Sequence, residues 1–228
     1  MDNAAQAVMH EYKDICLAFG ESDEFSFLFR KSTALYNRRQ AKILTTITSL
    51  FTSSYVLHWP QFFPDTPLKY PPSFDGRLVV YPSAKEVRDY FAWRQADTHI
   101  NNLYNTIFWA LVQQGGETTA QAHATLRGTV SGTKHEMLHS RFGMNYNSIP
   151  TRYRKGSVLI RERISAESSI SQPSEAEGDA AAPSSGEQTA RTLGQRAEKK
   201  SEARKRLSVL HCDIIGDEFW QQRPHLLE

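Results

Sequence analysis

The chain has 228 residues, of which 39% are hydrophobic, 11% aromatic and 23% charged, and its net charge of +2 does not by itself indicate a polyanionic partner. Its two cysteines exclude a disulfide framework and suit a reducing compartment. The sequence shows no signal-peptide pattern and no apolar run of the ~20 residues that cross a bilayer. We therefore expect a cytoplasmic protein, with the nucleus as an additional location, and no membrane partner.

The first third of the chain predicts a helix, a hairpin and a second helix. The N-terminal residues have the apolar spacing of an amphipathic helix, and a polar turn then separates two short runs of strand composition. The predicted segments are a hairpin from strands 15–19 and 25–30, a helix over 36–59 that Pro60 stops, and a proline-rich loop over 61–74.

The middle of the chain predicts a strand, three helices and a last strand. Asp75-Gly76 is typical of a tight turn before a strand, and the capping-box patterns at Ser83 and Thr133 predict helix starts. The segments are strand 77–81, a helix from Ser83, a helix from about Asp97 to Gly115, a shorter helix from Thr133, and strand 156–162.

Composition divides the chain into three parts. Residues 1–163 carry the predicted strands and helices. Residues 164–206 are rich in Ser, Ala, Gly and Pro and end in a basic run over 195–206, which predicts a disordered insert. Residues 207–228 regain apolar side chains, so we expect this C-terminal segment to pack back on the first part.

The turn Ser22-Asp23-Glu24 is the first candidate site. It interrupts the hairpin with two carboxylates, directly before the phenylalanine-rich strand FSFLF. A carboxylate presented by a rigid hairpin suits a hard cation such as Mg²⁺. The alternative is an ordinary polar turn.

Two further groups of polar residues are candidates. Arg38, Arg39 and Lys42 lie at the start of the predicted helix over 36–59, where cations and free N–H groups favour a phosphate, and a solvated basic face is the alternative. The segment HINNLYN contains three asparagines, which are poor helix formers, so they indicate hydrogen bonding to a base or phosphate, or internal capping. Lys134 and Asn145 are ligand contacts or ordinary surface. His211-Cys212-Asp213 lacks a ligand spacing typical of zinc.

Six segments together resemble the eukaryotic tRNA(His) guanylyltransferases: GESDEFSFLF, YPPSFDGRLVVYPS, RQADTHINNLYNTIFWALVQQGG, MNYN, YRKGSVLI and HCDIIGDEFW. The resemblance covers most of residues 1–160 and then 207–220. It implies an α+β fold with a polymerase-palm-like, ferredoxin-like antiparallel sheet and helices. It also implies a homo-oligomer, a tetramer in the family.

The resemblance implies a 3′→5′ nucleotidyltransferase that adds one guanosine to the 5′ end of tRNA(His). ATP first adenylylates the 5′-phosphate, the 3′-hydroxyl of GTP then attacks the activated end, and pyrophosphate is later removed. Two Mg²⁺ ions are used. The substrates are therefore ATP, GTP and tRNA(His).

The resemblance also assigns roles to individual residues. Asp23 matches a metal-binding aspartate, with Ser22 and Glu24 beside it in the catalytic and nucleotide site. Arg39 and Lys42 match triphosphate-binding positions. The residues that match positions needed for activity or tRNA contact are His99, Asn102, Lys134 and Asn145.

One departure from the family pattern is large. The family begins with a strand and an Asp-Gly-Arg loop that supplies the first metal carboxylate, whereas this sequence starts inside the helix that follows. Asp75-Gly76-Arg77 matches a different family motif. We expect a truncated chain with the first strand missing, and three functions are open: guanylyltransferase, inactive tRNA-binding or subunit-pairing protein, and a module that binds RNA through residues 195–206.

Overall fold

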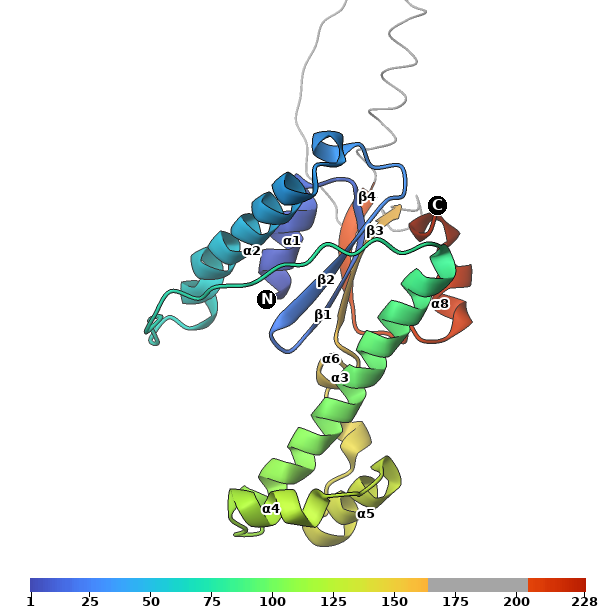
Figure 1. Cartoon of the computed structure of the whole chain (residues 1–228). Helices are drawn as coiled ribbons and strands as arrows, with labels where there is room; N and C mark the ends of the chain where they lie inside the picture. Colours follow the sequence, from blue (N-terminus) through green and yellow to red (C-terminus); the bar gives the residue numbers. More distant parts are fainter. Residues whose placement is uncertain (164–204) are drawn as a thin grey trace, which may run out of the picture. The chain divides into compact units, whose positions relative to one another are not determined.

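The computed structural model describes residues 1–163 and 205–228 and shows an antiparallel sheet accompanied by helices (Figure 1). The sheet has the order β2-β1-β3-β4, with both neighbours of β1 antiparallel to it. Its strands are β1 (Ile15–Glu21), β2 (Glu24–Phe29), β3 (Ser157–Arg163) and β4 (Lys205–Leu210). The predicted α+β class and hairpin are confirmed.

The helices fall before, between and after these strands. The helix α1 precedes the hairpin, α2 and α3 follow it, and three shorter helices lead to β3. Their bounds are α1 (Asp2–Glu11), α2 (Gln40–Phe62), α3 (Ala84–Gln113), α4 (Thr119–Leu126), α5 (Ser131–Phe142), α6 (Thr151–Lys155) and α8 (Asp217–Gln221), with the 3₁₀ turns η1 (Leu35–Arg38), η2 (Tyr146–Ser148) and η4 (Pro224–Leu226).

The helix α3 contributes to two apolar clusters of the described part of the chain. Phe91 of α3 packs with strand residues such as Leu17 and with Ile214 and Trp220 of the C-terminal segment. Leu103 to Leu111 of the same helix pack with α4 and α5. Because β1 is interior to the sheet, its residues Ile15–Gly20 are all buried, which explains a continuous apolar run instead of alternation.

Two predictions about the segment after α2 are wrong. Residues 77–81 pair with no strand of the described part, and Val79 and Val80 are 62% and 77% exposed, because strand composition forms a ladder only where a partner edge is available. No turn forms at Asp75-Gly76. A Cβ on Gly76 would lie 2.4 Å from Thr48 Oγ1, so the glycine instead permits close contact with α2.

The helix boundaries also differ from those predicted. The helix α2 continues through Pro60 to Phe62, because only the last two residues follow the proline and Phe63 N still donates to Trp59 O at 3.0 Å. The two helices predicted after Ser83 are one helix of 30 residues, since no breaker separates them. Ser83 caps it as predicted, whereas Thr133 lies inside α5 and does not begin it.

The predicted disordered insert over 164–206 lies outside the described residues, except that Lys205 and Arg206 begin β4. The C-terminal residues that follow include buried Ile214, Phe219 and Trp220, which belong to the same apolar cluster as β1. No helix among residues 1–163 and 205–228 combines the length and apolar content that a membrane crossing requires.

Gly156 gives a test of the packing between β1 and the start of β3. Its φ is +73°, and a Cβ there would lie 2.6 Å from the backbone oxygen of Gly20. We expect Gly156→Ala to lower the free energy of unfolding by about 2–4 kcal/mol in urea denaturation, because backbone strain and a backbone clash add. Gly132→Ala in α5, where a Cβ meets open space, should instead change it by less than about 1 kcal/mol. Equal effects would contradict this account.

Candidate active site

The turn between β1 and β2 places Asp23 at the tip of a rigid hairpin. Glu21 and Glu24 are cross-strand partners, so Ser22 and Asp23 alone connect the strands. Ser22 has a φ of +46°, as a tight two-residue hairpin turn requires at one central position. Both Ser22 and Asp23 are exposed, and Asp23 takes part in no ion pair among the described residues. Its carboxylate is therefore available to a ligand.

Aromatic side chains pack around this hairpin. Phe25 and Phe27 stack at 5.9 Å, and Phe51 of α2 lies 5.7 Å from Phe25 and 5.0 Å from Phe74. A Cβ on Gly20 would lie 2.2 Å from the Phe25 ring, so glycine is needed where the ring crosses β1. The phenylalanine pattern in β2 thus fixes the strand that carries the turn.

A single arginine binds the carboxylates on both sides of the turn. The Nη2 atom of Arg94 on α3 lies 2.8 Å from Glu21 Oε1, 2.7 Å from Glu24 Oε1 and 3.1 Å from Asp97 Oδ2. Burial lowers the pKa of Arg94, but the three carboxylates outweigh it and hold the pKa above its usual value. Burial and the charges of Glu21 and Asp23 raise the pKa of Glu24, against the opposing effect of Arg94. The Arg94 shift therefore follows from its three carboxylate partners, whereas the Glu24 shift follows first from burial.

A cavity of about 430 Å³ borders the turn. Gly20, Glu21 and Ser22 line one part of it, and the side chains of Tyr55 and Trp59 from the C-terminal half of α2 line another. At the N-terminus of α1, Asp2 binds Arg152 at 3.1 Å and accepts from Ser157 Oγ at 3.1 Å. The cavity therefore combines polar groups, aromatic rings and a helix N-terminus, and Ser22, which precedes Asp23 in the turn, is part of its lining.

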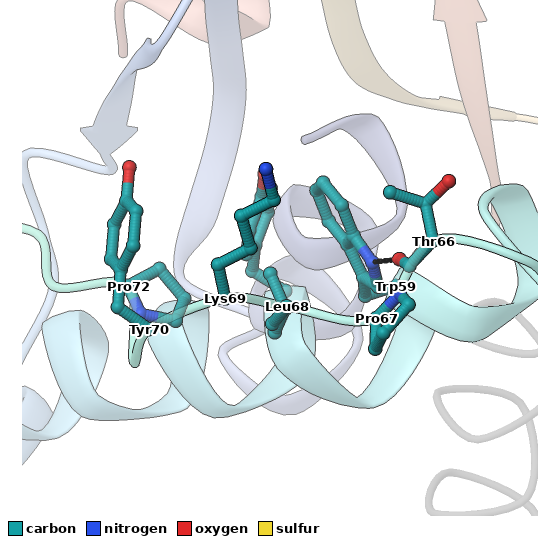
Figure 2. Close-up of a pocket in the computed structure, with 8 residues that line it drawn as sticks. Trp59, Thr66, Pro67, Leu68, Lys69, Tyr70 and Pro72 are labelled. Carbon is teal, nitrogen blue, oxygen red and sulfur yellow. Dashed lines mark hydrogen bonds between the residues drawn. The ribbon is translucent and has the colours of Figure 1, made fainter.

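A second cavity of about 290 Å³ shares Tyr55 and Trp59 with the first (Figure 2). The loop after α2 closes it with Pro67, Leu68 and Lys69, and Trp59 Nε1 donates to Thr66 O at 2.6 Å. Its lining is mostly apolar and aromatic.

The structure does not bring the predicted phosphate-binding cations next to Asp23 within this chain. The strand β2 leads away from the turn for six residues, about 17 Å, before η1 and the start of α2. Arg39 is the N-cap of α2 and Lys42 Nζ lies 4.4 Å from the Tyr36 ring centroid. Tyr36, Asn37 and Arg38 all have positive φ, so this connection is strained. The assignment of Arg39 and Lys42 to a triphosphate stays a prediction.

The other predicted residues gather around Tyr146. Its hydroxyl donates to Asn102 Oδ1 at 3.2 Å, and the rings of His99 and His135 lie 5.3 and 5.1 Å from its ring. Burial raises the pKa of Tyr146 to about 12. Burial, followed by electrostatic interaction with His135, Arg154 and Lys155, lowers the pKa of His99. His99 and Asn102 thus belong to one cluster around Tyr146, and the cations Arg154 and Lys155 act on His99.

Lys134 and Asn145 directly precede two members of this cluster in the sequence, His135 and Tyr146. Lys134 Nζ donates to Thr129 O at 2.7 Å and lies 6.0 Å from the Tyr104 ring centroid. Asn145 caps η2, since its Oδ1 accepts from Asn147 N at 3.0 Å. The bond from Asn147 N gives Asn145 a structural role as the cap of η2. A ligand contact through the exposed part of the Asn145 side chain stays a prediction.

The remaining candidates have structural partners. Asp75 and Arg77 form an exposed pair at 3.5 Å. His211 Nδ1 lies 2.9 Å from Gly156 O, and Asp213 binds Lys155 at 3.1 Å. No three His, Cys, Asp or Glu side chains of residues 1–163 and 205–228 are arranged to hold a metal ion by themselves.

Two protein-family models match almost the whole described chain. The model described as tRNAHis guanylyltransferase matches residues 1–82, and the one described as the Thg1 C terminal domain matches residues 85–216. The chain belongs to the tRNA(His) guanylyltransferase family.

Relatives from animals and fungi agree with this assignment. The chain is 47% identical to the probable tRNA(His) guanylyltransferase of Mus musculus, over 100% of this chain and 71% of the relative. It is 48% identical to the tRNA(His) guanylyltransferase of Schizosaccharomyces pombe, over 99% of this chain and 78% of the relative. The family resemblance read from the sequence is confirmed.

Solved structures of tRNA(His) guanylyltransferases share the fold. The Saccharomyces cerevisiae enzyme superimposes with a TM-score of 0.68 at 48% identity, covering 70% of this chain and 71% of that chain. A bacterial guanylyltransferase-like protein in complex with ATP superimposes with a TM-score of 0.65 at 19% identity, covering 99% of this chain and 76% of that chain, which shows the fold alone. The palm-like α+β fold expected of the family is confirmed.

The residues around the turn fit the Mg²⁺ that the guanylyltransferase family implies. An Mg²⁺ ion in a nucleotide enzyme needs only one or two protein carboxylates, because phosphates and water complete its shell. Asp23 offers such a carboxylate, exposed and unpaired among the described residues, whereas Glu21 and Glu24 are bound to Arg94.

Sequence reasoning missed two side chains of the guanylyltransferase fold, Arg94 and Gln95. The buried Gln95 amide donates to Lys155 O and Cys212 O, both at 2.9 Å, and accepts from Ile214 N at 2.7 Å. The signal available was the pair RQ beside Asp97 in RQAD, but the partners of the pair outside α3 lie between 60 and 119 residues away along the chain, and no local pattern identifies them.

Proposed function

We propose that this chain adds a guanosine nucleotide to the 5′ end of tRNA(His). The observation that carries the proposal is 48% identity to the Schizosaccharomyces pombe tRNA(His) guanylyltransferase over 99% of the chain, with Asp23 exposed at a rigid turn. The substrates are ATP, GTP and tRNA(His). A solved bacterial relative binds ATP and another solved structure of it holds GTP, which supports nucleotide substrates.

The proposed reaction has two phosphoryl transfers. The tRNA 5′-phosphate attacks the α-phosphorus of ATP, an adenylylated end forms and pyrophosphate leaves. The 3′-hydroxyl of GTP then attacks the activated 5′-phosphorus and AMP leaves. The triphosphate of the added nucleotide is later cut to release pyrophosphate.

The described residues supply binding and orientation for these steps. Asp23 would hold Mg²⁺, which would neutralise charge at the phosphates and lower the pKa of the attacking 3′-hydroxyl group. Ser22 and Glu24 flank it, and the cavity beside the turn offers aromatic surface from Tyr55 and Trp59 to a nucleobase. A two-metal arrangement is part of the proposal, with Asp23 as the ligand identified in this chain.

The proposed tRNA contacts lie around Tyr146. His99, Asn102, Lys134 and Asn145 come from α3, α5 and the segment before η2, and the cations Arg154 and Lys155 act on His99. A positive, partly desolvated set of donors suits RNA phosphates and single-stranded bases. We further propose a homo-oligomer, in which Arg39 and Lys42 would bind triphosphate, and a cytoplasmic location with the nucleus as an addition.

The purified chain incubated with 5′-monophosphorylated tRNA(His), ATP, Mg²⁺ and α-labelled GTP tests the proposal. We expect label in the tRNA only when all components are present, and none after EDTA, because the phosphates need a divalent cation. Retention of tRNA on a filter without label transfer would contradict the proposal and favour the inactive tRNA-binding or subunit-pairing alternative. Retention that disappears on deletion of residues 195–206 would favour the nonspecific RNA-binding alternative.

A further inference from the structure

Arg94 sits at the point where three carboxylates from three elements converge. Glu21 ends β1, Glu24 begins β2 and Asp97 lies one turn further along α3, and all three approach the same nitrogen, Nη2, within 2.7–3.1 Å. The Arg94 side chain is 12% exposed and the Glu21 side chain 7% exposed. Solvent therefore screens the Arg94–Glu21 pair poorly, and its loss would leave a buried charge.

The turn would be unfavourable without this cation. Glu21 and Glu24 are directly opposite each other in the ladder, where like charges destabilise an antiparallel pair. Asp23 adds a third negative charge between them. The charges of Glu21 and Asp23 indeed act on Glu24 in the direction that disfavours its ionised form. The three carboxylates of the sequence GESDE thus repel one another unless a cation lies close to them.

The Arg94 side chain is itself held in place from several sides. Its guanidinium carbon lies 4.4 Å from the Trp93 ring centroid, and Asn101 Nδ2 donates to the same Asp97 oxygen that Arg94 binds, at 3.1 Å. A cation held by an aromatic ring and by a carboxylate of its own helix keeps one geometry. The helix α3 therefore presents Arg94 to the turn as a fixed charge.

We propose that Arg94 is a positioning residue, which binds the two glutamates flanking the turn so that Asp23 alone is presented to the nucleotide-bound cation. The presentation of Asp23 to a nucleotide-bound cation rests on the proposed function. The binding of the two glutamates by Arg94 does not depend on it. Glu21 and Glu24 are then anchors of the hairpin, and their carboxylates are already occupied. The consequence for the reaction is geometric, since Arg94 contacts Glu21, Glu24 and Asp97 and acts on Asp23 through the turn.

Amide hydrogen exchange followed by mass spectrometry measures the local opening of the turn and does not depend on activity. In Arg94→Met we expect peptides that contain residues 21–25 to exchange about tenfold faster, because unpaired like charges open the turn locally. Peptides limited to residues 103–111 of α3 should exchange as in the wild type. Lys85→Met is the matched control, since it removes a cation from the same helix whose partner Asp89 is exposed, and it should leave the turn unchanged.

A double variant separates charge repulsion from simple packing. Arg94→Met combined with Glu21→Gln removes the repulsion between Glu21 and Glu24 while keeping the shape of the residue-21 side chain, so we expect at least half of the lost protection to return. If Arg94→Met does not fold, Arg94→Gln, which keeps an N–H donor, replaces it with the same expected direction. Unchanged exchange at the turn, or no recovery in the double variant, would overturn the inference.

Kinetics then test the link to Asp23. We expect Arg94→Met to lower kcat for guanosine addition by about tenfold or more while the KM for GTP changes by less than about twofold, because a misplaced ligand affects the reacting geometry. A normal kcat in a variant with a loosened turn would overturn the link to Asp23. An inactive wild type with the expected exchange pattern would instead contradict the proposed function and leave the anchoring of the turn supported.

Discussion

Asp23→Asn is expected to lower kcat for guanosine addition to tRNA(His) by about 10²–10³-fold, which is the range for loss of a group that stabilises transition-state charge. The amide keeps the shape of the side chain but binds a hard cation poorly. Because Asp23 is exposed and forms no ion pair among the described residues, the melting temperature should stay within about 2 °C of the wild type. Steady-state kinetics at saturating Mg²⁺ and a thermal melt measure both effects.

Asp75→Asn is the matched control for this prediction. Asp75 is also an exposed aspartate, and its ion pair with Arg77 is on the surface, so its removal should leave kcat within about twofold. An Asp23→Asn variant as active as Asp75→Asn would show that the hairpin turn is only a turn. An Asp23→Asn variant that loses stability together with activity would show a structural role.

Gln95→Leu is expected to lower the free energy of unfolding by about 3–5 kcal/mol, the largest stability effect that we derive. The buried amide satisfies two backbone carbonyls and one backbone N–H, and leucine has nearly the same size but leaves all three without it. Each buried backbone group left unsatisfied costs about 1–3 kcal/mol, and relaxation recovers a part. Urea denaturation followed by circular dichroism measures the change.

The same variant should loosen the C-terminal segment first, because two of the three bonds go to Cys212 and Ile214. Limited proteolysis should therefore cut near residues 212–216 earlier than in the wild type. Gln113→Leu, at the exposed end of the same helix, is the control and should change stability by less than about 0.5 kcal/mol. Equal losses in both variants would contradict the role given to Gln95.

Local sequence patterns predicted the elements whose structure depends on neighbouring residues. The hairpin was predictable because its two strands are adjacent and the turn residues are polar, and the start of α3 because Ser83 is a favoured cap. The strand predicted over 77–81 was wrong for the opposite reason. Its apolar residues have the right composition, but a strand needs a partner edge, and composition contains no information on whether one is available.

The residues of the candidate site also differ in how far the local sequence identifies them. From the local sequence an ordinary polar turn explains Asp23 as well as a metal site does, and the family resemblance favoured the metal site. Arg94 and Gln95 have many local explanations on a long helix, and their roles depend on residues 60 to 119 positions away or across the turn. Arg39 and Lys42 are near Asp23 in the sequence, but a strand of six residues separates them from the turn.

Sequencing of the tRNA 5′ end tests the central claim most directly. The purified chain would be incubated with 5′-monophosphorylated tRNA(His), ATP, GTP and Mg²⁺, beside a second tRNA of equal length and the Asp23→Asn variant. We predict one additional guanosine at the 5′ end of tRNA(His) with the wild-type chain, and unchanged ends with the second tRNA and with Asp23→Asn. An unchanged 5′ end of tRNA(His), or an equal addition by Asp23→Asn, would contradict the account.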